Sequence, residues 1–168
     1  MFIEAHRLSH YPERGTDVSV VLDLMIHDID ILLQLVQSKI SNIYASGKAV
    51  LTNSIDLANA RIEFENGCVA NLNASRVSEK KAREIRVFQD SGYLSLDFMN
   101  QKGHFIQKEG MSLKRNEVPV EKGEPLALEI ESFLDCVIKA KTPKTDGSFG
   151  KSALEVALSV TQKIESGW

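Results

Sequence analysis

The sequence lacks the glycine-rich G-x-G-x-x-G turn that binds dinucleotides, and it contains only two cysteines, Cys68 and Cys136. Neither cysteine belongs to a C-x-x-C pair, which argues against a disulfide framework or a zinc ribbon and predicts two reduced, buried thiols. The nearest approach to a phosphate-binding loop, Asp146 to Ser152, has Thr145 in place of the first glycine and no apolar strand before it. We therefore expect a loop and a helix start there.

The chain also lacks an excess of positive charge. A formal net charge of -3 gives no basic field of the kind that binds nucleic acid. The first residues show no basic segment followed by an apolar run, so no signal peptide is expected. Residues 18–36 form a long apolar stretch, but four ionisable side chains within it make a membrane span too costly. These are Asp23, His27, Asp28 and Asp30. We expect a cytoplasmic protein with a single domain over residues 1–168.

Short alternating segments predict eight strands. They are residues 2–8, 40–51, 55–65, 68–77, 84–89, 93–98, 104–108 and 112–118. Helices are predicted from about residue 17 to 37 with Thr16 or Asp17 as the cap, at 125–140, and at 149–164 with Ser148 as the cap. Turn residues such as Asn66-Gly67 separate the later strands and predict a meander of consecutive antiparallel neighbours.

A run of strands with helices before and after it is typical of an α+β domain. We predict an open, mainly antiparallel β-sheet with helices packed on one face. The opposite face is then left for solvent, for a partner or for a second copy of the chain.

The most informative segment is Asp23-Leu24-Met25-Ile26-His27-Asp28-Ile29-Asp30. At about 3.6 residues per turn, Asp23, His27 and Asp30 fall on one narrow stripe of a largely apolar helix. The stripe could be the solvated edge of a buried helix. Alternatively, Asp23 orients His27, which then serves as a general acid or base near neutral pH. A metal site formed by all three side chains is the weakest interpretation, because no fourth ligand is evident.

The pattern Asp-x-x-x-His-x-x-Asp resembles the motif that opens the C-terminal domain of the glucose-fructose oxidoreductase / inositol dehydrogenase / rhizopine-catabolism (Gfo/Idh/MocA) family. The closing segment, residues 143–157, is similar to that family's C-terminal signature. Met25 stands where the family usually has glycine. Residues 56–61 and 64–76 look most like a bacterial branch, the UDP-N-acetylglucosamine 3-dehydrogenases, which oxidise the sugar's 3-hydroxyl in amino-sugar lipid A synthesis.

This resemblance implies a glyceraldehyde-3-phosphate-dehydrogenase-like C-terminal domain. A separate Rossmann domain would bind NAD or NADP and supply the family's catalytic lysine, and neither its fingerprint nor its Glu-Lys-Pro motif occurs here. The chain would then be the substrate-binding and dimerisation half of an NAD(P)-dependent sugar oxidoreductase, inactive alone, and a homodimer or tetramer through its sheet face. The alternative is a non-catalytic remnant or an assembly module that dimerises through its sheet.

The resemblance also implies roles for individual residues. His27 would be the general base or acid at the sugar hydroxyl, Asp23 would position the sugar or orient His27, and Asp30 would support the substrate site. A basic cluster around Arg76 is either a solvated turn or a clamp for the diphosphate of a UDP-sugar. Arg76 is the best candidate in that cluster, and Arg14 is a second candidate for a substrate contact. No residue of this chain is expected to bind the cofactor or a metal.

Overall fold

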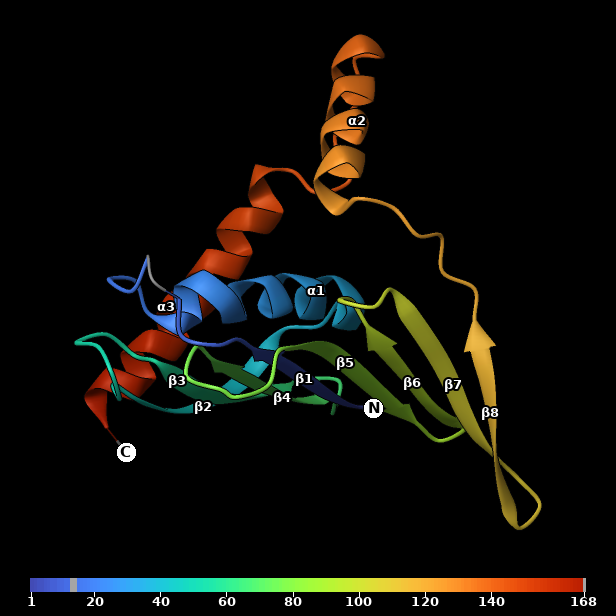
Figure 1. Cartoon of the computed structure of the whole chain (residues 1–168), viewed down its shortest axis with the longest axis horizontal. Coiled ribbons are helices and arrows are strands. Elements are labelled where there is room, and N and C mark those ends of the chain that lie inside the picture. Colours follow the sequence, from blue (N-terminus) through green and yellow to red (C-terminus); the bar gives the residue numbers. More distant parts are fainter. Residues whose placement is uncertain (13–14, 168) are drawn as a thin grey trace.

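A computed structural model of the chain describes residues 1–12 and 15–167. Its centre is an eight-stranded sheet in the order β2-β3-β4-β1-β5-β6-β7-β8 (Figure 1). The strands are β1 (Phe2–Leu8), β2 (Ile40–Lys48), β3 (Leu57–Phe64), β4 (Val69–Ser75), β5 (Ala82–Gln89), β6 (Gly92–Asp97), β7 (Lys102–Glu109) and β8 (Ser112–Val118). Every predicted strand is confirmed, with bounds that differ by three residues or fewer.

Strand β1 lies in the middle of the sheet, which corrects the predicted meander. It pairs in parallel with β4 and antiparallel with β5, so β2-β3-β4 and β5-β6-β7-β8 are two meanders joined across β1. All other pairs are antiparallel. Burial explains the position: Ile3 and Ala5 are fully buried, and a central strand covers such side chains better than an edge strand does.

Three helical segments cover one face of the sheet: two that are consecutive in the sequence, and the last helix of the chain. They are the π-helical turn η1 (Val21–Met25) and α1 (Ile26–Val36), and the last helix is α3 (Gly147–Ser166). Their apolar side chains form one core with β1, β3, β4 and β5. The most deeply buried members include Val21, Met25, Ile29, Leu32, Ile62, Leu72, Ile85 and Val160.

The first helix begins after Val20, later than predicted, and no side chain caps its first turn. The expected caps at Thr16 and Asp17 are therefore wrong. The reason is that the backbone before the helix is bound elsewhere. The Ser54 hydroxyl donates to the carbonyl oxygen of Thr16 at 2.8 Å, and Arg76 donates to the carbonyl oxygens of residues 15 and 18. The helix ends at Val36, one residue before the predicted end.

The last two helices differ in what they contact. α3 packs on α1 and β2, and Asp146 caps it by accepting a hydrogen bond from the Ser148 amide at 2.8 Å. The predicted cap, Ser148, is thus the donor. α2 (Pro125–Ile138) matches the predicted second helix, but it stands away from the sheet (Figure 1). None of the described helices combines the length and apolarity needed to cross a bilayer.

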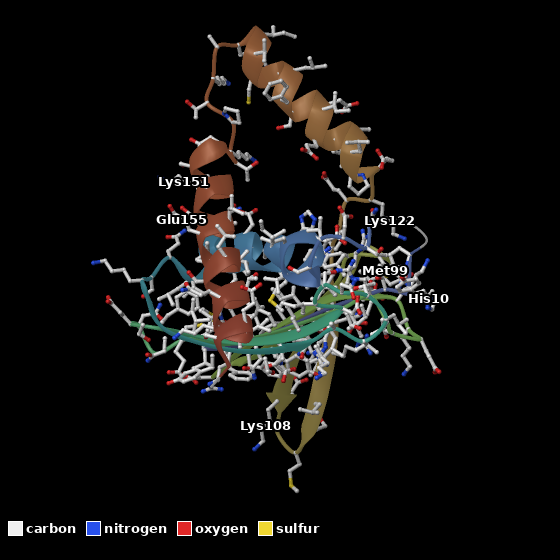
Figure 2. The ribbon with its side chains drawn as sticks, turned by 90° about the vertical axis from the view of Figure 1, so that its left-hand side faces the viewer. His10, Met99, Lys108, Lys122, Lys151 and Glu155 are labelled. Carbon is white, nitrogen blue, oxygen red and sulfur yellow. The ribbon has the colours of Figure 1, made fainter. Side chains whose placement is uncertain are left out.

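No segment of the described residues covers the sheet face opposite α1 and α3. Along β3 the buried Ala58, Ala60 and Ile62 alternate with the exposed Asn59 and Arg61. In Figure 2, Lys151 and Glu155 mark α3 on the covered side of the sheet, and Lys108 marks the projecting hairpin of β7 and β8. The open, mainly antiparallel sheet with helices on one face is confirmed for α1 and α3.

Candidate active site

An open cavity of ≈ 1040 Å³ lies beside the first helix. Three parts of the chain form its walls: η1 with α1, one end of the sheet, and the segment that leads into α2. The lining includes Asp23, Leu24, His27 and Ile31 from the helix, Arg7, Arg83, Leu96 and Asp97 from the strands, and residues 120, 121, 123–126, 128 and 129 from the third wall. We call it the His27 cavity.

Asp23 and His27 both open into the His27 cavity, and both are exposed. Asp23 lies in the π-helical turn and His27 in the first turn of α1. A π-turn has a wider repeat than the α-helix that the sequence analysis assumed, and such turns are frequent at functional sites. Among the described residues no hydrogen bond joins the two side chains, so the orienting contact stays a prediction.

Asp30 faces a different space. Its carboxylate accepts a hydrogen bond from Gln34 Nε2 at 3.0 Å. With His27 it lines a smaller cavity of ≈ 310 Å³ that also contains Asp146 and Phe149 from the start of α3. The predicted three-residue stripe therefore divides at His27, which borders both cavities, and Asp30 does not line the larger one. In the described part of the chain, no group of three His, Cys, Asp or Glu side chains could hold a metal ion.

An ion pair that the sequence analysis missed fixes the helix to the sheet next to His27. Arg7 Nε lies 3.0 Å from Asp28 Oδ2, and Arg7 Nη2 lies 2.7 Å from Asp28 Oδ1. Their side chains are only 11% and 6% exposed. Such a two-point contact sets orientation as well as distance. The available signal was Asp28 itself, a charged residue off the polar stripe of the predicted helix.

The structure corrects the expectation for Arg76. Its side chain is 1% exposed and lies 3.3 Å from the fully buried carboxylate of Asp56. It also donates to the carbonyl oxygens of Gly15 at 3.2 Å and Ile55 at 3.1 Å, and to that of Val18. A guanidinium so enclosed has no room for a diphosphate. Arg76 instead fixes the loop that leads into η1.

The carboxylate of Asp56 accepts the other hydrogen bonds of this buried cluster. The amides of Val50, Leu51 and Thr52 donate to its Oδ2 at 2.7 to 2.9 Å, and the Thr52 hydroxyl donates to Oδ1 at 2.7 Å. Burial raises the pKa of Asp56, but the hydrogen bond from Thr52 and those from the three amides outweigh it and hold the pKa far below its usual value. The carboxylate therefore stays charged opposite Arg76.

The remaining basic candidates do not form one patch. Arg83 lines the His27 cavity, whereas Arg86 lies on the other side of β5 and pairs with Glu4 at 3.8 Å. Lys80 and Lys81 are exposed in the preceding loop. Arg14, the second candidate for a substrate contact, lies outside the described residues. The expected diphosphate clamp is therefore not assembled by this cluster.

The third wall of the His27 cavity is held by one glutamine. Gln101 Nε2 donates to the carbonyl oxygen of Gly123 at 2.8 Å, and the Gly123 amide donates to Gln101 Oε1 at 2.9 Å. A Cβ at position 123 would meet Leu128 Cδ1 at 2.6 Å, so the side chain of Leu128 packs directly on this glycine. These contacts place the start of α2 opposite Asp23 and His27.

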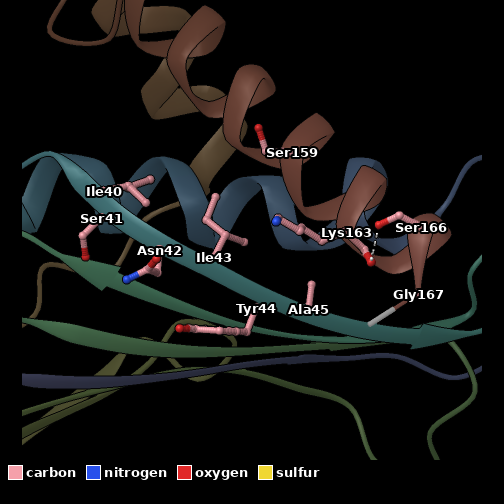
Figure 3. Close-up of a pocket in the computed structure, with 10 residues that line it drawn as sticks. All are labelled: Ile40, Ser41, Asn42, Ile43, Tyr44, Ala45, Ser159, Lys163, Ser166 and Gly167. Carbon is pink, nitrogen blue, oxygen red and sulfur yellow. Dashed lines mark hydrogen bonds between the residues drawn. The ribbon is translucent and has the colours of Figure 1, made fainter.

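A second hollow lies at the other end of the molecule, between β2 and the end of α3 (Figure 3). Its volume is ≈ 520 Å³, and its polar lining includes Ser41, Asn42, Tyr44 and Lys163. No carboxylate or histidine is among its lining residues. It therefore offers no acid–base pair of the kind that opens into the His27 cavity.

The fold and the motif from Asp23 to Asp30 point to a class of protein, and a family model identifies it. Residues 4–95 match the family model described as the GFO/IDH/MocA C-terminal domain. The chain belongs to this family of oxidoreductases and represents its C-terminal domain, as the motif at Asp23 to Asp30 predicted.

Particular relatives share the fold over nearly the whole chain. UDP-N-acetylglucosamine 3-dehydrogenase from Acidithiobacillus ferrooxidans is 37% identical over 98% of this chain and 55% of its own length. A solved structure of that enzyme superposes with a TM-score of 0.90 over 98% of this chain and 54% of the solved chain. The NAD(+)-dependent scyllo-inositol 2-dehydrogenase of Bacillus subtilis is 26% identical over 88% of this chain and 46% of its own length. The chain thus spans about half the length of these relatives.

Proposed function

We propose that this chain is the substrate-binding half of an NAD(P)-dependent oxidoreductase that acts on a nucleotide sugar, with UDP-N-acetylglucosamine oxidised at its 3-hydroxyl. The observation that carries the proposal is that Asp23 and His27 both line the His27 cavity, in a chain 37% identical to a UDP-N-acetylglucosamine 3-dehydrogenase. The cytoplasm is the compartment in which such a nucleotide sugar and NAD(P) would be met.

The chemistry needs a proton acceptor at the reacting hydroxyl. Oxidation of a secondary alcohol removes a hydride from carbon and a proton from oxygen, and the carbon–oxygen bond becomes a carbonyl. Bound NAD(P)+ would supply the hydride acceptor and leave as NAD(P)H. An imidazole nitrogen of His27 would take the proton, because histidine changes charge near neutral pH. Asp23 would hydrogen-bond the sugar or the imidazolium that forms.

The surroundings of His27 support this role. The Arg7–Asp28 pair fixes α1 on β1 one residue away from His27, so the imidazole projects from a backbone that the sheet holds in place. Asp30 would support the substrate site from the neighbouring cavity, which it shares with His27. A proton acceptor must stay in line with a bound hydroxyl to within hydrogen-bonding distance, so a rigid support is what the reaction requires.

The test uses a fusion of this chain to the part of the Acidithiobacillus ferrooxidans relative that it does not match. We expect His27→Gln to lower kcat for UDP-N-acetylglucosamine by about 10²–10⁴-fold and to change KM little. The matched control is His6→Gln, on β1 and outside the His27 cavity, which should leave kcat within about twofold. Unchanged turnover in His27→Gln would remove this residue from the mechanism. The chain alone should form no NADH.

The open face of the sheet supports a second proposal, that two or four copies associate through it. Exposed Tyr44, Asn59 and Arg61 lie on this face, which no segment of the described chain covers. Light scattering at micromolar concentration should give a dimer or tetramer, and Arg61→Glu should shift it toward monomer. A monomer in the unsubstituted chain would contradict this association. A stable dimer whose fusion is inactive would favour the assembly-module alternative.

A further inference from the structure

One face of α2 is apolar along its whole length. Leu126, Ile130, Phe133, Leu134 and Val137 follow the i, i+4, i+7, i+8, i+11 spacing that places side chains on one side of a helix. Each of them is at least half exposed, and Phe133 is 57% exposed. We call these five side chains the α2 apolar face. An exposed face of this kind is rare on a domain that has no partner.

The rest of the described chain (residues 1–12 and 15–167) does not cover this face. Across Pro125–Ile138 no residue is buried, and no substantial packing joins α2 to another helix or strand of the described chain. Figure 1 shows α2 standing above the layer of α1 and α3. Its other side carries charged side chains such as Glu131 and Asp135, and Asp135 pairs with Lys139 at 2.5 Å. A charged side that faces solvent and an exposed apolar side together indicate a helix that packs against a partner.

The start of α2 is nevertheless fixed in position. Glu124 caps the helix by accepting a hydrogen bond from the Ala127 amide at 2.7 Å, and Gln101 holds Gly123 through two hydrogen bonds. The α2 apolar face is also continuous with the candidate site, because Leu126 lines the His27 cavity. A partner that covered this face would therefore also close over His27.

The relatives indicate what that partner is. The solved Acidithiobacillus ferrooxidans structure matches 98% of this chain, so α2 lies within the shared fold, yet the match covers only 54% of the solved chain. We propose that the α2 apolar face is the docking surface for the nicotinamide-binding half of the same enzyme, and that docking completes the wall of the His27 cavity. This inference rests on the function proposed above. A second copy of this chain would cover the apolar side chains without bringing a hydride acceptor to the cavity.

Hydrogen exchange tests the docking directly. The exchange of the α2 amides is compared between the chain alone and the same chain in the fusion described above. We expect the α2 amides to exchange at least about tenfold more slowly in the fusion than in the chain alone, because packing suppresses local opening. The β7–β8 hairpin, which projects away from α2, should exchange equally in both and serves as the internal reference (Figure 2). Strands β1 and β4 report whether the fusion has folded.

A matched pair of substitutions separates docking from general damage to the helix. Phe133→Asp places a charge on the α2 apolar face, whereas Ser132→Asp places the same charge one residue earlier, about 100° around the helix and off that face. Phe133→Asp should abolish the slowing in the fusion and leave the urea midpoint of the isolated chain unchanged. Ser132→Asp should leave both unchanged.

The outcomes distinguish failure of docking from failure of the proposed function. Equal exchange of α2 in the fusion and in the chain alone overturns the docking, even if the fusion oxidises UDP-N-acetylglucosamine. Slowed exchange without turnover supports the docking and removes the substrate assignment. Slowing that arises in the chain alone as its concentration rises identifies a second copy as the occupant and overturns the proposal. If β1 and β4 show that the fusion is unfolded, the same comparison on the matching helix of the intact relative decides.

Discussion

The helices α1 and α2 have nearly the same apolar content and opposite surroundings. In α1 the side chains of Ile29 and Leu32 are fully buried. In α2 the equally apolar Phe133 and Leu134 are 57% and 51% exposed. Both helices carry an apolar side and a polar side. The difference lies in what the chain itself places against each of them.

The connections of the two helices explain this difference. α1 follows a loop that Arg76 and Ser54 tie to the core, and it lies directly over the centre of the sheet, with Arg7 holding Asp28. α2 follows β8, the strand at the sheet's edge, and the residues between them are held only near Gly123. The apolar side of an amphipathic helix favours packing against an apolar surface, but the pattern does not specify which surface. For α1 the partner is in this chain, and for α2 we place it in the other half of the enzyme.

The buried cluster that fixes the approach to η1 should give the largest effect on stability. Asp56→Ala leaves the guanidinium of Arg76 enclosed without its counter-ion, and loss of one partner of a buried pair costs about 3–5 kcal/mol. Urea denaturation of the isolated chain measures this cost. The control is Glu4→Gln at the partly exposed pair with Arg86, which should cost less than about 1 kcal/mol. Similar losses for both would show that the loop before η1 is not held by Asp56.

The same cluster predicts a pH dependence. Because the pKa of Asp56 is lowered in the folded chain, its contribution is fully present above the unfolded value of 3.8 and is lost as the pH falls below it. The free energy of unfolding should therefore decrease on acidification below about pH 4, and less steeply in Asp56→Asn than in the unsubstituted chain. Parallel curves would contradict the assignment of this loss to Asp56.

A second pair of substitutions compares the helices themselves. Leu32→Ala removes a fully buried side chain from α1 and should cost about 2–5 kcal/mol in the isolated chain. Leu134→Ala makes the same chemical change in α2, where the side chain is half exposed, and should cost less than about 1 kcal/mol. Urea midpoints measure both. In the fusion, Leu134→Ala should become more costly than in the isolated chain; if it does not, α2 has gained no partner there.

Much of this fold could be predicted because strand periodicity and turn residues are local signals. The Asn66-Gly67 turn and the alternation of Ala58 to Ile62 identify β3 and β4 within two residues. The place of β1 could not be predicted in this way, because strand order depends on burial between segments far apart in the sequence. The position of α2 was missed for a different reason: its sequence fits a packed helix, but no helix or strand of the described chain packs substantially against it.

The site shows the same division between local and distant information. A polar stripe in an apolar helix is visible in the sequence, so His27 and Asp23 could be named as candidates, and both line one cavity. The π-helical turn that contains Asp23 was not visible, since an α-helical repeat was assumed. Arg76 was misassigned because a basic residue near a strand end looks the same whether it meets solvent or a buried carboxylate. Only the contact with Asp56, twenty residues earlier, decides between the two.

The smallest predicted effect concerns the segment that joins β8 to α2, where Gln101 binds Gly123. Gln101→Ala removes both hydrogen bonds to Gly123 and should cost about 1 kcal/mol of stability, with faster exchange of the Gly123 amide. Gln37→Ala is a close control, because Gln37 and Gln101 have the same left-handed backbone, with φ of 48° and 49°. Any strain of alanine at positive φ is then common to both variants, and the difference between them belongs to the side-chain bonds. In the fusion, Gln101→Ala should weaken catalysis only if the position of α2 shapes the His27 cavity. Equal exchange at Gly123 in the two variants would mean that Gly123 is held by the packing of Leu128 instead.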